Sequence, residues 1–134
     1  EVADRVYQNS SVGKLRLTGT LLNAMDLVGG GQVAVLNVED RVLEKTGCAP
    51  DDLEGLINMP LAAQSIKAVV MFKEIDGQLR VSLRSKGAVD VRAVATLQGG
   101  GGHQNAAGFS IPKPDAASRS DVVTAVITAV ECVA

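Results

Sequence analysis

Aromatic residues are almost absent from this chain of 134 residues. It contains no tryptophan, and its aromatic residues are Tyr7, Phe72 and Phe109. The core must therefore be built mainly from aliphatic side chains. Proteins that bind single-stranded nucleic acid usually stack its bases on aromatic rings. The composition therefore disfavours a long nucleic-acid track, and Phe109 is the one ring placed near a glycine-rich segment where a base could stack.

Excess positive charge and long apolar runs are missing as well. The formal charge is −2 at pH 7, which argues against a broad basic surface for duplex binding but allows a focused phosphate site made by a few Arg and His side chains. No segment has the length of a membrane span or the pattern of a signal peptide. We therefore expect a cytoplasmic protein with no membrane partner.

Cysteine and histidine are too few to build a metal centre. Cys48 and Cys132 have no metal-ligand spacing and are predicted to be buried thiols in a reducing compartment. His103 is the single histidine, and no cluster of Asp or Glu accompanies it at ligand spacing. We expect no metal ligand in this chain.

Glycine, in contrast, is concentrated at one place, where Gly99, Gly100, Gly101 and Gly102 directly precede His103. Four consecutive glycines suit a packed element poorly, because glycine loses the most backbone entropy on folding. They suit a backbone that closely approaches another group. The segment is suited to bind an anion, most naturally a phosphate, because it combines three features. These are exposed backbone amides, an imidazole and a following run of small residues able to begin a short helix.

The first half of the chain is predicted to contain two strands and two helices. Residues 14–22 alternate between apolar and polar side chains, as in a half-buried strand, and residues 32–38 form its partner after a loop at 29–31. Residues 39–46 are predicted to be helical, with Gly47 as the stop signal. A short helix begins near Pro50 and runs towards Asn58.

The second half predicts a hairpin, a helix, a short strand and a final helix. The nearly continuous apolar segment 66–75 is typical of a buried strand, and Asp76-Gly77 predicts a tight turn into an alternating strand at 79–84. Asp90 is placed to cap a helix over 90–98. A strand at 109–111 and a helix capped by Ser120 follow. The order indicates an α/β domain, with α+β as the alternative, built on a central mixed sheet.

Arg84 ends the alternating strand and is the second candidate for phosphate binding. Its guanidinium matches a phosphate at two points, and the hydroxyls of Ser82 and Ser85 flank it. A strand-end arginine can equally be a solvated surface residue, as we expect for Arg80 and Lys86.

Glu54 and Asn58 form a further candidate pair. They fall four apart and share one helical face if the helix continues that far. Hydrogen bonding within the loop is the alternative role for both.

Several segments in order resemble one known family. Residues 100–108 read G-G-G-H-x-x-A-A-G, which is similar to the signature of the DHH-associated domain, the substrate-binding C-terminal half of DHH-family phosphoesterases. Residues 52–58, 81–86 and 90–91 resemble the branch of oligoribonucleases that also dephosphorylate phosphoadenosine phosphate. The resemblance implies substrate binding by Arg84, Ser85, Gly99, Gly100, Gly101, Gly102 and His103, with Ser82, Glu54 and Asn58 as weaker candidates.

The resemblance also implies a partner domain. Hydrolysis in this family uses two divalent metal ions, expected to be manganese, held by an N-terminal half that contains an Asp-His-His triplet. No such triplet occurs here. We therefore expect residues 14–134 to be the substrate-binding domain, residues 1–13 to be the end of a linker helix, and the catalytic half to belong to the same longer polypeptide. A homodimer is compatible with this arrangement.

The function implied is hydrolysis of short oligoribonucleotides or 3′-phosphoadenosine 5′-phosphate by the complete enzyme, with this chain as the part that binds substrate. A non-catalytic RNA-binding module is the alternative, since a related domain ends alanyl-tRNA synthetases. Other branches of the family act on cyclic dinucleotides, polyphosphate or single-stranded DNA. A protein-interaction domain, whose glycines only permit close packing, is the third possibility.

Overall fold

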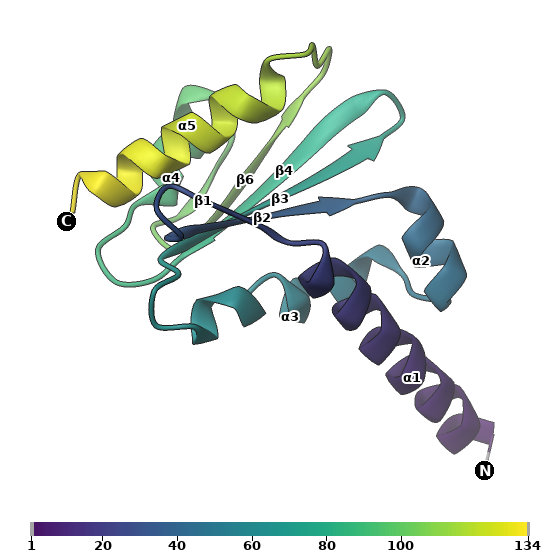
Figure 1. Ribbon diagram of the computed structural model, residues 1–134. Coiled ribbons are helices and arrows are strands. Elements are labelled where there is room, and N and C mark those ends of the chain that lie inside the picture. Colours follow the sequence, from purple (N-terminus) through teal and green to yellow (C-terminus); the bar gives the residue numbers. More distant parts are fainter. Residues whose placement is uncertain (1, 134) are drawn as a thin grey trace.

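A six-stranded mixed sheet carries helices on both faces in the computed structural model, which describes residues 2–133 and their side chains from residue 12 onward (Figure 1). The strands lie in the order β1-β2-β3-β4-β6-β5; β2 and β3 are parallel and all other neighbours are antiparallel. The predicted α/β class and single domain are confirmed. The elements, in chain order, are α1 (Val2–Asn23), β1 (Asp26–Val28), β2 (Val33–Val38), α2 (Asp40–Thr46), η1 (Pro50–Asp52), α3 (Leu53–Leu56), η2 (Met59–Ala62), β3 (Ala68–Ile75), β4 (Gln78–Ser85), α4 (Val91–Leu97), β5 (Gly101–His103), β6 (Ala106–Ile111) and α5 (Ser118–Glu131).

One face of the sheet is covered along its length by α4 and α5 (Figure 1). Its core is aliphatic, as predicted, with the two phenylalanines added: Phe72 and Phe109 are 1% and 2% exposed. Since Phe109 is enclosed in this core, the prediction that its ring could stack a base is wrong. Sheet and helix side chains meet here, among them Val70, Val81, Leu83, Val94, Val122 and Val126.

The opposite face is covered only in part. The short helical segments and α1 bury β2 and β3 under a second aliphatic core that includes Leu17, Leu36, Leu56, Val69 and Met71. No residue of β4, β5 or β6 belongs to this core. The side chains of these three strands on this side are therefore left open. We call this surface, made by β4, β6 and β5 beside α3, the open face.

The segment 14–22 is helical rather than extended, so the predicted strand is wrong. Leu17 and Leu21 are both buried while Leu15 is 72% exposed, which is the pattern of a helix and not of a strand. Gly13 lies directly against the backbone of Thr46 and lets α1 pack closely on α2. The helix passes residue 13 without a break.

The local turn and cap signals are confirmed. Gly47 ends α2 in the left-handed conformation at φ 68°. Asp76 and Gly77 have φ values of 52° and 79° and join β3 to β4. The carboxylate of Asp90 accepts from the amide of Ala93 at 3.2 Å, as expected of a helix cap.

Three local predictions are wrong. The residues after His103 form a hairpin into β6 and not a helix, because Gln104 and Asn105 make a tight turn. Ser120 lies inside α5, whose N-cap is Ala117. Cys132 is exposed and Cys48 only half-buried, so neither is a fully buried thiol. Among the described residues, no helix is both long enough and apolar enough to cross a membrane.

Candidate functional site

The strand register brings Arg84 and His103 onto the same face of the sheet. Arg84 of β4 pairs with Ala106 of β6, and Ala106 pairs with His103 of β5. Directly paired residues point to the same side of an antiparallel sheet, so these three form one row across the open face. Two strand spacings separate the Cα atoms of Arg84 and His103 by roughly 10 Å. Ala106, with its small side chain, thus lies between Arg84 and His103 in this row, and the guanidinium of Arg84 is directed to Leu83 and Glu54.

A second row is almost free of side chains. Ser82 pairs with Gly108, which pairs with Gly101. This row lies beside the first, because alternate residues of a strand share a face. Gly108, Gly101 and the neighbouring Ala106 therefore form a floor of small residues, bordered by the polar groups of Arg84, His103 and Ser82. The guanidinium of Arg80 lies over Gly108, so Gly101 is the place where a ligand can approach the backbone closely.

The glycines before His103 are explained by the fold, with one exception. Gly102 has φ 140°, and a Cβ there would lie 2.6 Å from the Cα of Ala107. Gly100 is similarly packed against Phe109, and Gly99 turns the chain out of α4 at φ 82°. Gly101 has no positive φ, and no atom of the described chain lies within 4 Å of the position that a Cβ would take there. The four glycines thus form a bend and an edge strand. Among them, Gly101 is the one whose missing side chain leaves space for a ligand.

Because Gly101 and Gly102 differ in this way, alanine at the two positions should affect different properties. The Gly102 variant should lose stability, and the Gly101 variant should lose ligand binding. Gly102→Ala should lower the free energy of unfolding by about 1–3 kcal/mol or more, because strain at φ 140° adds to a steric clash. Gly101→Ala should leave the thermal unfolding midpoint nearly unchanged and weaken phosphate-ligand binding, because its methyl group would occupy the floor. Circular dichroism melts and ligand titrations of both variants test this. Equal binding by Gly101→Ala and wild type would exclude a ligand on the floor.

The hairpin that carries His103 is anchored by Asn105. Its Nδ2 donates to the hydroxyl of Ser85 at 2.9 Å and to the carbonyl of Val89 at 3.2 Å, and the backbone amide of Ser85 donates to the carbonyl of Asn105 at 3.0 Å. Sequence reasoning missed Asn105, because it stands at a variable position of the glycine motif. It fixes the place of the preceding imidazole.

Ser85 supports this anchor and lies away from the open face. Its side chain is buried, 5% exposed, and its hydroxyl donates to the carbonyl of Val89 at 2.7 Å. Successive strand residues point to opposite faces, so the neighbour of Arg84 turns inward. The prediction of substrate contact by Ser85 is therefore corrected to a structural role.

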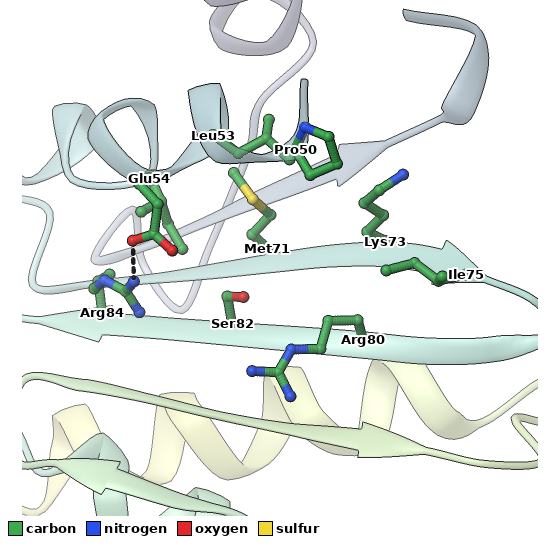
Figure 2. Close-up of a pocket in the computed structure, with 10 residues that line it drawn as sticks. Pro50, Leu53, Glu54, Met71, Lys73, Ile75, Arg80, Ser82 and Arg84 are labelled. Atoms are coloured by element: carbon green, nitrogen blue, oxygen red, sulfur yellow. Dashed lines mark hydrogen bonds and ion pairs between the residues drawn. The ribbon is translucent and has the colours of Figure 1, made fainter. Parts of the chain in front are cut away.

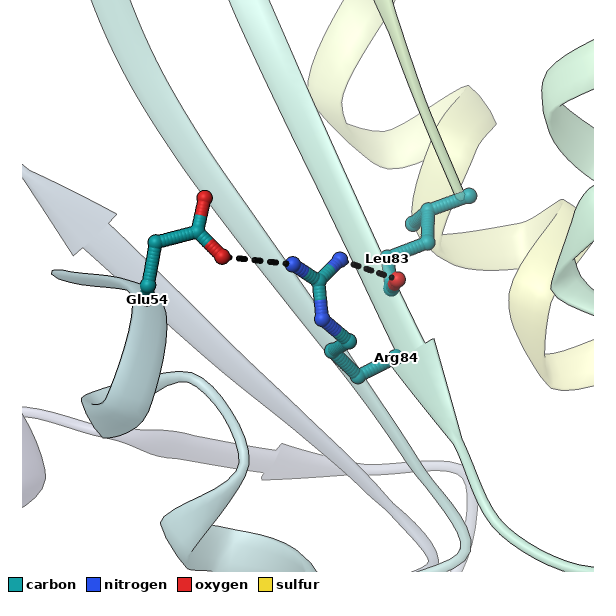
Figure 3. A network of polar contacts seen from close by, with 3 residues as sticks. All are labelled: Glu54, Leu83 and Arg84. Carbon is teal, nitrogen blue, oxygen red and sulfur yellow. Dashed lines mark hydrogen bonds and ion pairs between the residues drawn. The ribbon is translucent and has the colours of Figure 1, made fainter. Parts of the chain in front are cut away.

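Arg84 is held from two sides (Figure 3). Its Nη1 donates to the carbonyl of Leu83 at 2.9 Å, and its Nη2 lies 3.4 Å from Oε2 of Glu54. The Arg84 side chain is 17% exposed, whereas that of Glu54 is 77% exposed. A long ion pair whose carboxylate is solvated is weak, so Glu54 orients the guanidinium and leaves it able to bind an incoming anion.

Asn58 does not join this group. The predicted shared face of Glu54 and Asn58 required the helix to continue to Asn58. Helix α3 ends at Leu56, so the two residues do not share a helical face. Asn58 is exposed and begins η2, where its carbonyl accepts from the amide of Leu61.

Lys86 differs from the expectation of a solvent-facing side chain, whereas Arg80 is exposed, as predicted. The Nζ of Lys86 donates to the carbonyls of Leu61 and Ala63 at 2.7 and 2.9 Å, so it fastens η2 to the sheet instead of facing solvent. Arg80 is exposed, but its guanidinium lies above Gly108, where a Cβ would be 2.9 Å from Nη2. It therefore borders the glycine floor.

A recess adjoins the open face between α3 and the sheet (Figure 2). Its volume is about 140 Å³. Polar side chains at its rim come from the site, and its walls are mainly apolar. We call it the recess; it is lined by Pro50, Leu53, Glu54, Ile57, Met71, Lys73, Ile75, Arg80, Ser82 and Arg84.

No metal centre is present in residues 2–133 as far as the structure describes them. No group of three or more His, Cys, Asp or Glu side chains is placed to hold an ion. His103 is exposed on the edge strand, apart from any carboxylate cluster. The donor set of the described residues therefore does not fit the metal ions implied by the resemblance.

The chain belongs to the DHHA1 domain family, whose model matches residues 30–131. It is 33% identical over 119 residues to the bifunctional oligoribonuclease and PAP phosphatase NrnA of Bacillus subtilis, covering 89% of this chain and 37% of that protein. It is also 33% identical over 112 residues to the NrnA of Thermus thermophilus, covering 83% of this chain and 32% of that protein. The chain thus spans about a third of the length of these relatives.

Solved structures share the fold. An exopolyphosphatase-related protein from Bacteroides fragilis superposes with a TM-score of 0.75 at 25% identity, covering 87% of this chain and 34% of that one. A pGpG-specific phosphodiesterase from Vibrio cholerae superposes with a TM-score of 0.63 at 12% identity, over 98% of this chain and 43% of that one, which speaks for the fold alone. The resemblance to phosphoesterases of the DHH family is confirmed.

Proposed function

We propose that this chain is the substrate-binding half of a metal-dependent phosphoesterase that hydrolyses short oligoribonucleotides or 3′-phosphoadenosine 5′-phosphate. The observation that carries the proposal is the row in which Arg84 and His103 flank Ala106 on the open face. A cation and a hydrogen-bond donor in one row of the same face can bind one group, and a phosphate suits both. The activities of the two NrnA relatives supply the substrate class.

The open face also suits a site shared with another domain. Its polar side chains border a floor without bulky groups, so a second surface can approach the substrate from outside the sheet. In the proposal, the metal ions, manganese by the family resemblance, belong to that second domain and supply the hydrolytic water there. The residues of this chain bind and orient the phosphate.

The proposal predicts binding without hydrolysis for the 134-residue chain alone. Mixed with Mn²⁺ and a 5′-labelled RNA dinucleotide, the chain should release no mononucleotide, because the described residues hold no metal cluster. The same dinucleotide should perturb the amide resonances of Gly101 and His103 in a titration followed by NMR. Metal-dependent turnover by the chain would contradict the division of labour, and unperturbed resonances would contradict the site.

A non-catalytic RNA-binding module is the second candidate. The C-Ala domain of Aquifex aeolicus alanyl-tRNA synthetase superposes with a TM-score of 0.53 at 15% identity, over 78% of this chain and 96% of that domain, so it shares the fold. The buried positions of Phe72 and Phe109 and the net charge of −2 speak against a long RNA track. Binding that grows with RNA length beyond a few nucleotides would favour this candidate.

A further inference from the structure

The recess beside the open face has mainly apolar walls, which suit an apolar ligand group. On one side stand Pro50 and Leu53 from the η1–α3 segment, and on the other Met71 and Ile75 from β3 (Figure 2). Leu53 and Met71 are 7% and 4% exposed and form fixed walls, while Ile75 is 43% exposed at the mouth. Small-molecule sites combine apolar walls of this kind with a few polar groups that fix orientation.

Two of the three cations that line the recess, Lys73 and Arg80, are directed away from its centre, and the third, Arg84, belongs to the site already described. The Nζ of Lys73 lies 2.6 Å from Oδ1 of Asp40, so its charge is already paired. The guanidinium of Arg80 lies over Gly108 on β6 and within 3.5 Å of the hydroxyl of Ser110. Neither side chain makes the recess an anion site, and an apolar ligand group is favoured over a second phosphate.

The recess is continuous with the site, because Arg84 and Ser82 line both. A phosphate placed between Arg84 and His103 therefore has the mouth of the recess beside it. In a nucleotide, the sugar joins the phosphate to a base. The base is flat and has apolar faces and a polar edge. The hydroxyl of Ser82, which lines the recess, is a polar group that can hydrogen-bond to such an edge.

We propose that the recess is a nucleobase subsite, in which the base lies between the aliphatic walls of the η1–α3 segment and β3 instead of stacking on an aromatic ring. The proposal rests on the proposed function, since Arg84 and His103 supply the phosphate anchor. Phe72 and Phe109 are enclosed on the covered face, so neither ring is available for stacking. Aliphatic side chains and the stem of Arg80 are left to contact the base faces.

Two ligands that differ only in the base test the proposal. Titration calorimetry on the chain should give a dissociation constant about tenfold lower for AMP than for ribose 5-phosphate, the scale expected when one apolar ring is removed from water. Equal affinities would overturn the base subsite while leaving the phosphate site intact. No binding of either compound would overturn the phosphate site and the subsite together.

The absence of tryptophan allows the base to be located by fluorescence. Ile75→Trp places a single indole at the mouth of the recess, and Leu27→Trp places one on β1, where Leu27 is similarly exposed at 53%. AMP should change the emission of Ile75→Trp and not of Leu27→Trp, and ribose 5-phosphate should change neither. If AMP binds but leaves the emission of Ile75→Trp unchanged, or changes both variants equally, the base lies elsewhere. Melting curves confirm that both variants are folded.

Discussion

His103→Ala should reduce kcat/KM of the complete enzyme by roughly 10²–10³-fold towards an RNA dinucleotide, the scale measured when one donor to a developing negative charge is removed. The imidazole is exposed on the edge strand and makes no hydrogen bond to other described groups that would be lost on substitution. The thermal unfolding midpoint should therefore stay nearly constant. The measurement pairs steady-state kinetics with a melting curve.

The metal content and a conservative variant define the role more closely. Bound Mn²⁺ should be the same in His103→Ala and wild type, because the metal ions belong to the other domain in the proposal. His103→Asn keeps a short hydrogen-bond donor and should recover part of the lost activity. Normal kcat/KM in His103→Ala would refute the assigned role, and loss of bound metal would show that the histidine is a ligand.

Arg84→Ala should lower kcat/KM by roughly tenfold to more than a hundredfold, which corresponds to about 1.5–3 kcal/mol for a hydrogen bond to a charged group. The carboxylate of Glu54 left behind is 77% exposed and returns to water without a buried, unpaired charge. The fold should therefore survive, with a loss of stability limited to the packing of the Arg84 stem, whose side chain is 17% exposed. Arg84→Lys should restore less than half of the lost binding energy, because an ammonium cannot match the phosphate at two points.

Two control variants separate binding from general electrostatics. Arg92→Ala removes the same charge from an exposed position of α4, outside the open face, and should leave kcat/KM unchanged. Glu54→Gln removes the partner of Arg84 and should have a much smaller effect than Arg84→Ala, because the pair is long and its carboxylate is exposed to water. A parallel fall of activity and melting temperature in Arg84→Ala would mark the arginine as structural.

The elements that sequence alone predicted well are those with strong local signals. Gly47, the Asp76-Gly77 turn and the Asp90 cap each demand one backbone conformation, and the structure has it at each place. The segment 14–22 failed because leucines at positions 17 and 21 fit a helix and a strand alike. The segment is helical because it packs on α2 and β2. These tertiary contacts cannot be deduced from the local sequence pattern.

The sequence proposes Arg84, His103 and Gly101 as candidates but not how they lie relative to one another. Arg84, His103 and Gly101 meet on one face only because β6 pairs with both β4 and β5, a non-local register that no local sequence pattern reveals. The glycine run was expected to open a helix that cradles an anion. It is an edge strand, since Asn105 ties the following turn to Ser85 and Val89. Arg80 became visible as part of the site only through its position above Gly108.

In the uncovered half of the sheet, the residues that pack the core and the residues that can bind a ligand are different residues. The inward side of β4 and β6 carries the packing, and their outward side carries the polar groups, so substitutions at Arg80, Ser82 or Ser110 leave the core untouched. Such a surface can exchange one ligand for another without a compensating loss of stability. In this chain, the exposed side chains of the open face can therefore be replaced with little effect on the packing of α4 and α5 behind the sheet.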